Sequence, residues 1–175
     1  MKNINFYLII ILFSFFFILS SERNDHDSFL FSDISDIGNS LEIEFIKHGE
    51  LYLKNNNFVI KKIDIELAYK EIDKRNGLKY RSFLKEDRGM LFVLNDQEEY
   101  KKINMENMRI PLDIVYVNQL NVVVFVDQYV SPIEKFEIIN LPSDIKYVLE
   151  INAGMSNKWG IKNGITKMIW NLNKE

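Results

Sequence analysis

A single carboxylate, Asp113, interrupts the apolar stretch Leu112–Val117. Side chains of a strand alternate between two faces, so Asp113 shares its face with Val115 and Val117. An isolated carboxylate on an apolar face is costly to desolvate, and it therefore needs an ionic partner or hydrogen-bond donors. We expect Asp113 to be buried and ionised and to fix a neighbouring loop; an active-site role is the alternative.

Two kinds of partner are available to this carboxylate. The first is an arginine, and the chain offers Arg81, Arg88 and Arg109. The second is the backbone N–H groups of the preceding loop, Met105–Ile110. In that loop Asn107 can shape the backbone or contact a ligand, because asparagine bonds nearby backbone groups and tolerates left-handed geometry. Met105 is more typical of core filling. The candidate binding residues are Arg81, Met105, Asn107 and Asp113.

A second carboxylate, Glu150, alternates with Leu149 and Ile151 and is predicted to be a solvated strand residue. Together with Asp113 it could form a pair like that of glycoside hydrolases. The alternative function is therefore an extracytoplasmic hydrolase or lyase that uses Asp113 with Glu150 or Arg81. No serine stands in a Gly-x-Ser-x-Gly frame, and no glycine-rich phosphate loop occurs, so catalysis remains the second choice.

The composition excludes several classes of site. The chain has no cysteine and only two histidines, which rules out disulfides and cysteine-ligated metals and argues against a multi-histidine metal site. We expect no metal and no cofactor. The net charge is -3, with 22 basic residues scattered among 25 acidic ones. This balance gives no electrostatic footprint for nucleic acid.

The first residues predict export. Lys2 precedes an apolar run, Phe6–Leu19, which is followed by Ser20, Ser21 and an acidic flank. This is the form of a signal peptide, although the cleavage site is poor. An uncleaved anchor of about 20 apolar residues is the alternative. Either would place the body outside the cytoplasm, in the periplasm or anchored in the inner membrane. We expect residues 1–21 to be the signal or anchor, 22–40 a flexible tether and 41–175 a single β-rich domain.

The body is dominated by short strand patterns. We expect strands at Leu41–Phe45, paired with Leu51–Leu53, and at Ile63–Leu67, Gly89–Leu94, Leu112–Val117, Val122–Val126, Tyr147–Ile151 and Ile165–Trp170. Val122–Val126 is apolar on both faces and should be a central strand. Helices are expected at Tyr69–Asn76, ended by Gly77, and at Ala153–Gly160. The predicted fold is mainly β, a compact sandwich or partly closed barrel with one or two short helices, preceded by an N-terminal apolar helix.

An ordered set of short segments carries a family resemblance. The segments are Ile65–Ala68, Gly77–Arg81, Gly89–Leu94, Met105–Asn107, Ile110–Val117 and Val148–Gly154. In this order they resemble the uncharacterised family called domain of unknown function 192, over roughly residues 63 to 167. The resemblance implies a compact β-rich fold, often behind an export signal, and no established activity. The family usually reads Phe-Trp-Met-Lys-Asn-Thr where this chain has Ile103–Met108, and Asp where it has Ile165.

These observations favour a non-catalytic domain of the cell envelope with a binding or structural role. The expected partner is an envelope saccharide, a peptide or another envelope protein, and the membrane itself if the N-terminal segment is not cleaved. The sequence does not identify the ligand or a reaction.

Overall fold

The computed structural model describes residues 42–96, 98–133, 141 and 144–173. The predicted signal or anchor, the predicted tether 22–40 and Leu41 lie outside the described residues. Within the described residues, no helix is both long and apolar enough to cross a membrane.

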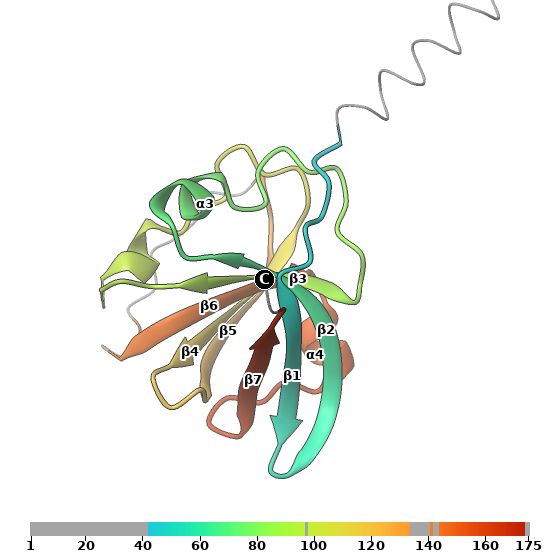
Figure 1. The fold of residues 1–175 in the computed structure, drawn as a ribbon, viewed down its shortest axis with the longest axis vertical. Coiled ribbons are helices and arrows are strands. Elements are labelled where there is room, and N and C mark those ends of the chain that lie inside the picture. The colour runs from blue at the N-terminus through green and yellow to red at the C-terminus, as the bar shows by residue number, and fades with distance from the viewer. Residues whose placement is uncertain (1–41, 97, 134–140, 142–143, 174–175) are drawn as a thin grey trace, which may run out of the picture. The chain divides into compact units, whose positions relative to one another are not determined.

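The described residues form one mixed sheet with short helices beside it (Figure 1). In chain order the elements are β1 (Gly49–Asn55), β2 (Phe58–Ala68), α3 (Glu71–Asn76), β3 (Arg88–Val93), the 3-10 helix η1 (Glu99–Lys102), β4 (Leu112–Asn118), β5 (Val123–Val130), β6 (Ile145–Asn152), α4 (Met155–Trp159) and β7 (Thr166–Leu172). The mainly-β prediction and both short helices are confirmed.

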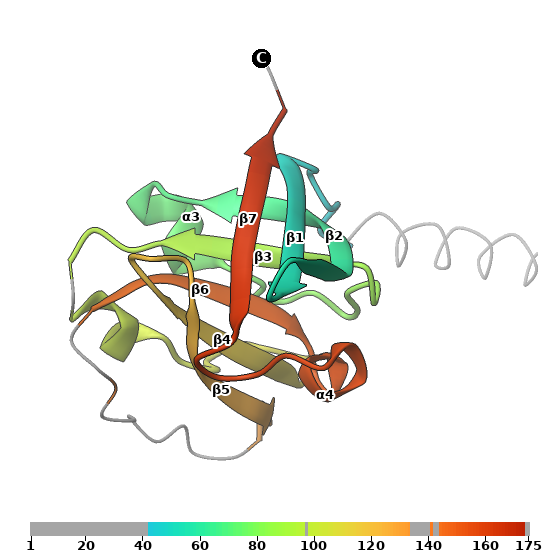
Figure 2. The same cartoon turned by 90° about the horizontal axis from the view of Figure 1, so that it is seen from below.

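The seven strands lie in the order β5-β4-β6-β3-β2-β1-β7. Only β2 and β3 pair in parallel, and α3 with the loop after it forms their crossover. The sheet curls until its two outer strands approach (Figure 2). Val122, the residue before β5, forms an isolated antiparallel bridge with Lys167 of β7. The architecture is therefore one curled sheet rather than a sandwich, and it is not a closed barrel.

Two strand predictions were wrong. Residues 43–47 are irregular, and β1 starts at Gly49 instead. Both neighbours of β1 are already present as β2 and β7, which leaves no adjacent edge for an extra strand. Gly49 is the first residue of β1 and packs closely on β7, because a Cβ there would lie 2.3 Å from the Asn171 carbonyl oxygen. The hairpin turn lies at Asn56, whose φ is 54°.

The second error concerns β5, which is an outer strand although its sequence predicts a central one. Its apolar side chains are covered on both faces because the sheet curls. Val124 and Phe125 pack against one core cluster, and Val126 packs against the other. The N–H of Gly164 also donates to the Val123 carbonyl at 2.8 Å, so the segment before β7 covers the strand edge.

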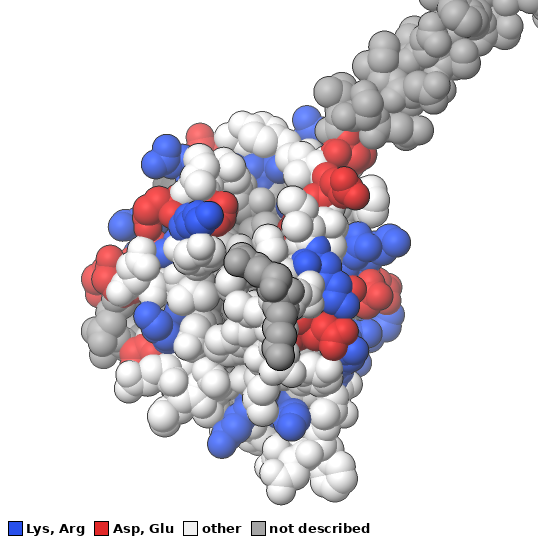
Figure 3. Space-filling model, in the orientation of Figure 1, with Lys and Arg blue, Asp and Glu red and all other residues white. Residues whose placement is uncertain are grey.

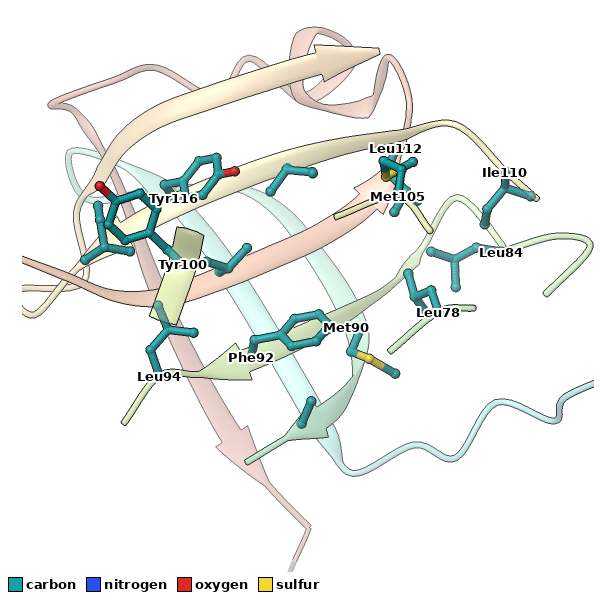
Figure 4. Packing of buried hydrophobic residues seen from close by; sticks show 14 residues of the cluster. Leu78, Leu84, Met90, Phe92, Leu94, Tyr100, Met105, Ile110, Leu112 and Tyr116 are labelled. Atoms are coloured by element: carbon teal, nitrogen blue, oxygen red, sulfur yellow. The ribbon is translucent and has the colours of Figure 1, made fainter. Parts of the chain in front are cut away.

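The sheet separates two cores. The inner core lies inside the curl and includes Leu91, Val115, Leu149 and Ile151. The outer core lies on the opposite face. Figure 4 shows its labelled members, with Met105, Ile110 and Leu112 towards one end and Tyr100 and Tyr116 towards the other. α3, η1 and the loop 103–110 belong to the outer side, whereas Met155 and Trp159 of α4 pack on the inner core.

Replacing Ile151 by alanine should destabilise the fold much more than the same change at Ile169. Ile151 is fully buried on the central strand β6, whereas Ile169 on the outer strand β7 is 42% exposed. A buried Ile→Ala change leaves a cavity and costs about 2–5 kcal/mol, but a surface change costs about 0.5 kcal/mol. Urea unfolding of the two variants measures the difference. Equal midpoints would contradict the assignment of β6 to the sheet centre.

Candidate functional site

The Asp113 carboxylate is fully buried and receives four hydrogen bonds. Its Oδ1 accepts from the N–H groups of Tyr129 at 2.9 Å and Gly154 at 3.0 Å. Its Oδ2 accepts from the Ser156 N–H at 2.8 Å and from the Ser156 hydroxyl at 2.7 Å. Both oxygens of this desolvated carboxyl group therefore have hydrogen-bond donors, as its place on an apolar face requires.

A bulge in β5 brings the Tyr129 donor to this carboxylate. Leu112 pairs with Val130 and Ile114 pairs with Asp127, so Gln128 and Tyr129 together face Asp113. The extra residue bends the strand and re-aims its groups. Tyr129 adopts a φ of 58° at this point. Its N–H is directed at the Asp113 side chain rather than at a backbone carbonyl of β4.

The other donors come from the start of α4. The N-cap residue of this helix is Gly154, which has no side chain to accept from the first N–H groups. Helix starts leave such N–H groups without intrahelical partners, and Asp113 accepts from them across 41 and 43 positions of sequence. Glycine at the start of this helix, where a capping side chain usually stands, is the feature of the sequence that indicates an acceptor from elsewhere in the chain.

The burial of Asp113 is as predicted, and three of its four donors are backbone N–H groups, the kind of donor that was expected. The residues that were predicted to supply them were wrong. None of its four bonds comes from the Met105–Ile110 loop or from an arginine. Arg81 is buried and forms an ion pair with Glu66, with 2.7 Å between Nη2 and Oε2. Arg88 lies over the ring of Phe45, 4.4 Å from the ring centre. Arg109 is exposed.

Met105 and Asn107 lie on the outer side of the sheet, away from Asp113. Met105 is buried in the outer core, in keeping with a core-filling role. Asn107 is exposed and has a φ of 60°, the left-handed geometry expected of a loop-shaping asparagine. Its carbonyl accepts from the Tyr80 N–H at 3.0 Å, which ties the loop to the segment after α3.

The prediction that Glu150 is a solvated strand residue was wrong. The residue is buried, with only 6% of its surface exposed. In the sheet register Asp113 faces Ile151 and Ile114 faces Glu150. Because adjacent side chains point to opposite faces, Asp113 and Glu150 lie on opposite sides of the sheet. A glycosidase-like pair of these carboxylates is therefore ruled out, and Arg81 is held by Glu66 instead.

Glu150 lies at the bottom of a cleft of about 260 Å³ on the outer side, which we call the α3–η1 cleft. Its walls come from the C-terminal half of α3 and the residues after it, from η1, and from the loop 103–108. Phe92 and Leu94 of β3 add apolar surface. The full lining is Glu71, Lys74, Arg75, Asn76, Gly77, Leu78, Lys79, Phe92, Leu94, Glu99, Lys102, Ile103, Asn104, Met108 and Glu150.

Burial raises the pKa of Glu150 to about 8. No hydrogen bond to its carboxyl group is formed by the described residues, so nothing offsets the cost of desolvating the charge. At neutral pH the group is therefore mostly an uncharged carboxylic acid that can donate its proton in a hydrogen bond. A buried carboxyl of perturbed pKa in a cleft is a physical mark of a functional site.

The neighbouring carboxyl group of Glu99 titrates in the other direction. Burial is the largest effect and raises its pKa, but the Asn95 N–H and the Lys74 ammonium together outweigh it, so the pKa is lowered overall. The Lys74 Nζ lies 2.9 Å from Glu99 Oε1 and 3.6 Å from Glu71 Oε1. The cleft therefore contains one neutral and one ionised buried carboxyl group.

A second depression, of about 1030 Å³, lies on the other side of the Gly77–Lys79 segment. It contains Glu66 and Arg81, whose charges offset one another. Glu66 also accepts from the Ile46 N–H at 2.8 Å. The α3–η1 cleft has the stronger claim to be the ligand site, because its buried carboxyl group has no such partner.

Comparisons with known proteins agree with this fold. The model of the family described as "Uncharacterized ACR", domain of unknown function 192, matches residues 52–169. No curated protein matches the chain.

Two solved structures are similar. One is a protein of unknown function from Novosphingobium aromaticivorans, 26% identical, with a TM-score of 0.60, covering 69% of this chain and 84% of that one. The other is described as a candidate transcription regulator from Sinorhizobium meliloti, 22% identical, with a TM-score of 0.59, covering 73% of this chain and 98% of that one. The second likeness concerns the fold alone.

Asp113→Ala should destabilise the protein by about 3–5 kcal/mol, because buried donors that lose their acceptor cost about 1–3 kcal/mol each. Asp113→Asn should fall between this variant and the parent, since an amide has one acceptor oxygen in place of two. Urea unfolding measures both.

Two controls accompany this experiment. Ser156→Ala removes one of the four bonds to Asp113, together with the bond that this hydroxyl accepts from the Gln128 side chain, and should cost about 1–2 kcal/mol. Asp127 is the matched aspartate on β5, and its pKa is raised, first by burial and then by the Asp113 charge. Asp127→Asn should be neutral or stabilising at pH 7. An Asp113→Ala protein as stable as the parent would refute the anchoring role.

The pKa of Glu150 predicts a pH-dependent stability. Its folded pKa of about 8 exceeds the ordinary glutamate pKa of 4.5, so the folded state binds the proton more tightly. This contribution is complete below pH 4.5 and is lost as the pH rises to about 8. The loss is on the order of 3–5 kcal/mol. Glu150→Gln should remove this slope and be more stable than the parent at pH 8. Parallel pH profiles of unfolding free energy for parent and variant would show that the group is not desolvated.

Proposed function

This chain belongs to the uncharacterised domain of unknown function 192 family, and from that premise we propose that it is an extracytoplasmic, envelope-associated binding domain that takes a small ligand in the α3–η1 cleft. One observation carries the proposal: a cleft of about 260 Å³ ends at a buried carboxyl group, Glu150, that no described residue engages. Buried polar groups normally have hydrogen-bond partners, so a bound molecule is the natural partner here.

The cleft is built from segments that can vary without disturbing the sheet. α3, η1 and the loop 103–108 supply its walls, while the sheet supplies only its base. Binding residues are often carried by loops on a rigid scaffold. Asn104 and Met108 both line the cleft, and both stand where the family pattern has another residue. The ligand of this member is then set by its own loop.

The arrangement favours binding over hydrolysis. Asp113, the best catalytic candidate of the sequence, uses both its oxygens to hold β5 and α4. His48 accepts the Leu67 N–H at its Nδ1 and lies outside the α3–η1 cleft. Among the described residues, no three His, Cys, Asp or Glu side chains are grouped so that they could hold a metal ion. The proposed role is therefore non-catalytic, with a small fragment of an envelope saccharide or peptide as the ligand.

Filling the cleft should abolish ligand binding without unfolding the protein. Asn104→Trp places a bulky side chain in the exposed wall of the cleft. Asn57→Trp makes the same change at an exposed residue of the β1–β2 turn and is the matched control. A thermal-shift screen of cell-wall fragments and sugars should give hits with the parent and with Asn57→Trp but not with Asn104→Trp. Hits that survive Asn104→Trp would place the site elsewhere.

Export is the second element of the proposal, and it rests on Lys2, the apolar run Phe6–Leu19 and the acidic flank. These residues lie outside the described part of the chain. A reporter that is active only in the periplasm, fused after Glu175, should be active. The same fusion lacking residues 1–21 should be inactive. Activity of only a cytoplasm-dependent reporter would overturn the proposal of an extracytoplasmic location.

A further inference from the structure

We propose that the ligand of the α3–η1 cleft is a small organic anion, a carboxylate on a compact and partly apolar body, held between the Glu150 carboxyl group and a basic rim. This inference rests on the proposed function and adds the charge and size of the ligand. Its support comes from the rim, the base and the dimensions of the cleft.

The rim carries basic side chains that form no ion pair within the described part of the chain. Arg75, Lys79 and Lys102 line the cleft, and none of them forms an ion pair with a described residue. Lys74 is already engaged by Glu99 and Glu71. Figure 3 shows basic and acidic atoms side by side over the part of the surface where Figure 1 places α3. Four cationic side chains and, besides Glu150, two acidic ones line the cleft, so the local field favours an anion.

The base of the cleft offers a hydrogen bond rather than a negative charge. A protonated Glu150 presents one O–H donor, which an anionic oxygen of a ligand can accept at short distance. A carboxylate ligand would thus share the proton of a buried carboxyl group. A cationic ligand would need Glu150 in its ionised form, which burial disfavours, and would also meet the basic rim.

Several other titratable groups lie near Glu150. On β4 the pKa of Tyr116 is raised, first by burial and then by Asp127, Glu150 and Tyr100. Met90 of β3 pairs with Glu150, and Glu66 of β2 pairs with Met90 on its other side. The Glu66 carboxylate forms an ion pair with Arg81. On β5, Asp127 lies one position beyond Ile114 in the cross-strand row of Glu150, and its pKa is raised, first by burial and then by Asp113. The other charged groups near Glu150 are those of the lining: Glu71, Lys74, Arg75, Lys79, Glu99 and Lys102. Glu150 is the buried lining carboxyl group whose pKa is raised.

The dimensions and the apolar lining limit the body of the ligand. The volume of about 260 Å³ lies just below the roughly 300–1,000 Å³ of sites for drug-sized molecules. Leu78, Phe92 and Leu94 are buried residues that contribute apolar surface. A single ring or short branched chain bearing one carboxylate fits these limits, whereas an extended polymer does not.

Three monosubstituted benzenes of similar size and different charge test the inference: benzoate, benzamide and benzylamine. Each is titrated into the full chain in a mild detergent, with binding followed by calorimetry. We expect benzoate to bind most tightly. Its affinity should fall by up to about tenfold per pH unit above the Glu150 pKa of about 8. Tighter binding of benzylamine or benzamide, or an affinity that rises with pH, would overturn the inference while leaving a ligand site in the cleft.

Variants locate the effect. Glu150→Gln keeps an N–H donor without a titrating proton, so benzoate should still bind within about threefold and lose the pH dependence around 8. Lys79→Met should weaken benzoate about threefold to fivefold, as expected for one partly exposed charge. Lys167→Met, at an exposed position of β7, is the matched control and should have no effect.

Two further results would overturn the inference. One is an unchanged benzoate affinity in Lys79→Met, and the other is no benzoate binding up to its solubility limit. Far-ultraviolet circular dichroism of each variant verifies the fold. Binding that persists in Asn104→Trp would instead refute the proposed function, because the anion site would then lie outside the cleft.

Discussion

The alternation of side chains along β4 and β6 is the constraint on which the rest of this structure depends. In the register of these two strands, Asp113 faces Ile151 and Ile114 faces Glu150. One step along the sheet therefore places the two buried carboxyl groups on opposite faces. The desolvation cost of each group must be offset by its own partners, because the two groups cannot share a partner across the sheet. The inner group, Asp113, anchors β5 and α4, and the outer group, Glu150, has no hydrogen-bond partner in the described parts of the chain.

Three buried acidic side chains show three physical solutions to desolvation. Asp113 is satisfied by four donors from β5 and α4. Glu66 is satisfied by Arg81 and by the Ile46 N–H, although Glu66 Oε2 and Arg81 Nε make no well-aligned hydrogen bond. Glu150 has neither kind of partner among the residues that the structure describes, and burial favours its protonated form. The carboxylate oxygens of Asp113 and Glu66 are already bonded to protein groups, whereas the protonated Glu150 keeps an O–H donor that a ligand can use.

The covering of the outer face determines where that donor can be reached. α3 is six residues long, and η1 is four, so neither covers the sheet completely. Gly77 ends α3 with a φ of 51°, and a Cβ there would lie 3.4 Å from the Phe92 ring. The chain after α3 therefore passes close over β3. The loop 103–108 completes the wall, where its Asn107 carbonyl accepts from the Tyr80 N–H. The cleft is the space that these short segments leave above Glu150.

The sequence by itself determined the local features of this protein. Alternation located the strands around Ile63–Leu67, Gly89–Leu94, Leu112–Val117 and Tyr147–Ile151, Gly77 ended α3, and an apolar face required Asp113 to find donors. Only the tertiary structure decided which donors these are, that Glu150 is buried, that β5 is an outer strand, and that no strand precedes β1 in the described residues. The physical reason is that periodicity and turn chemistry act over a few residues. Desolvation depends instead on segments such as α3 and α4, which pack against strands far away in the chain and whose positions no local pattern specifies.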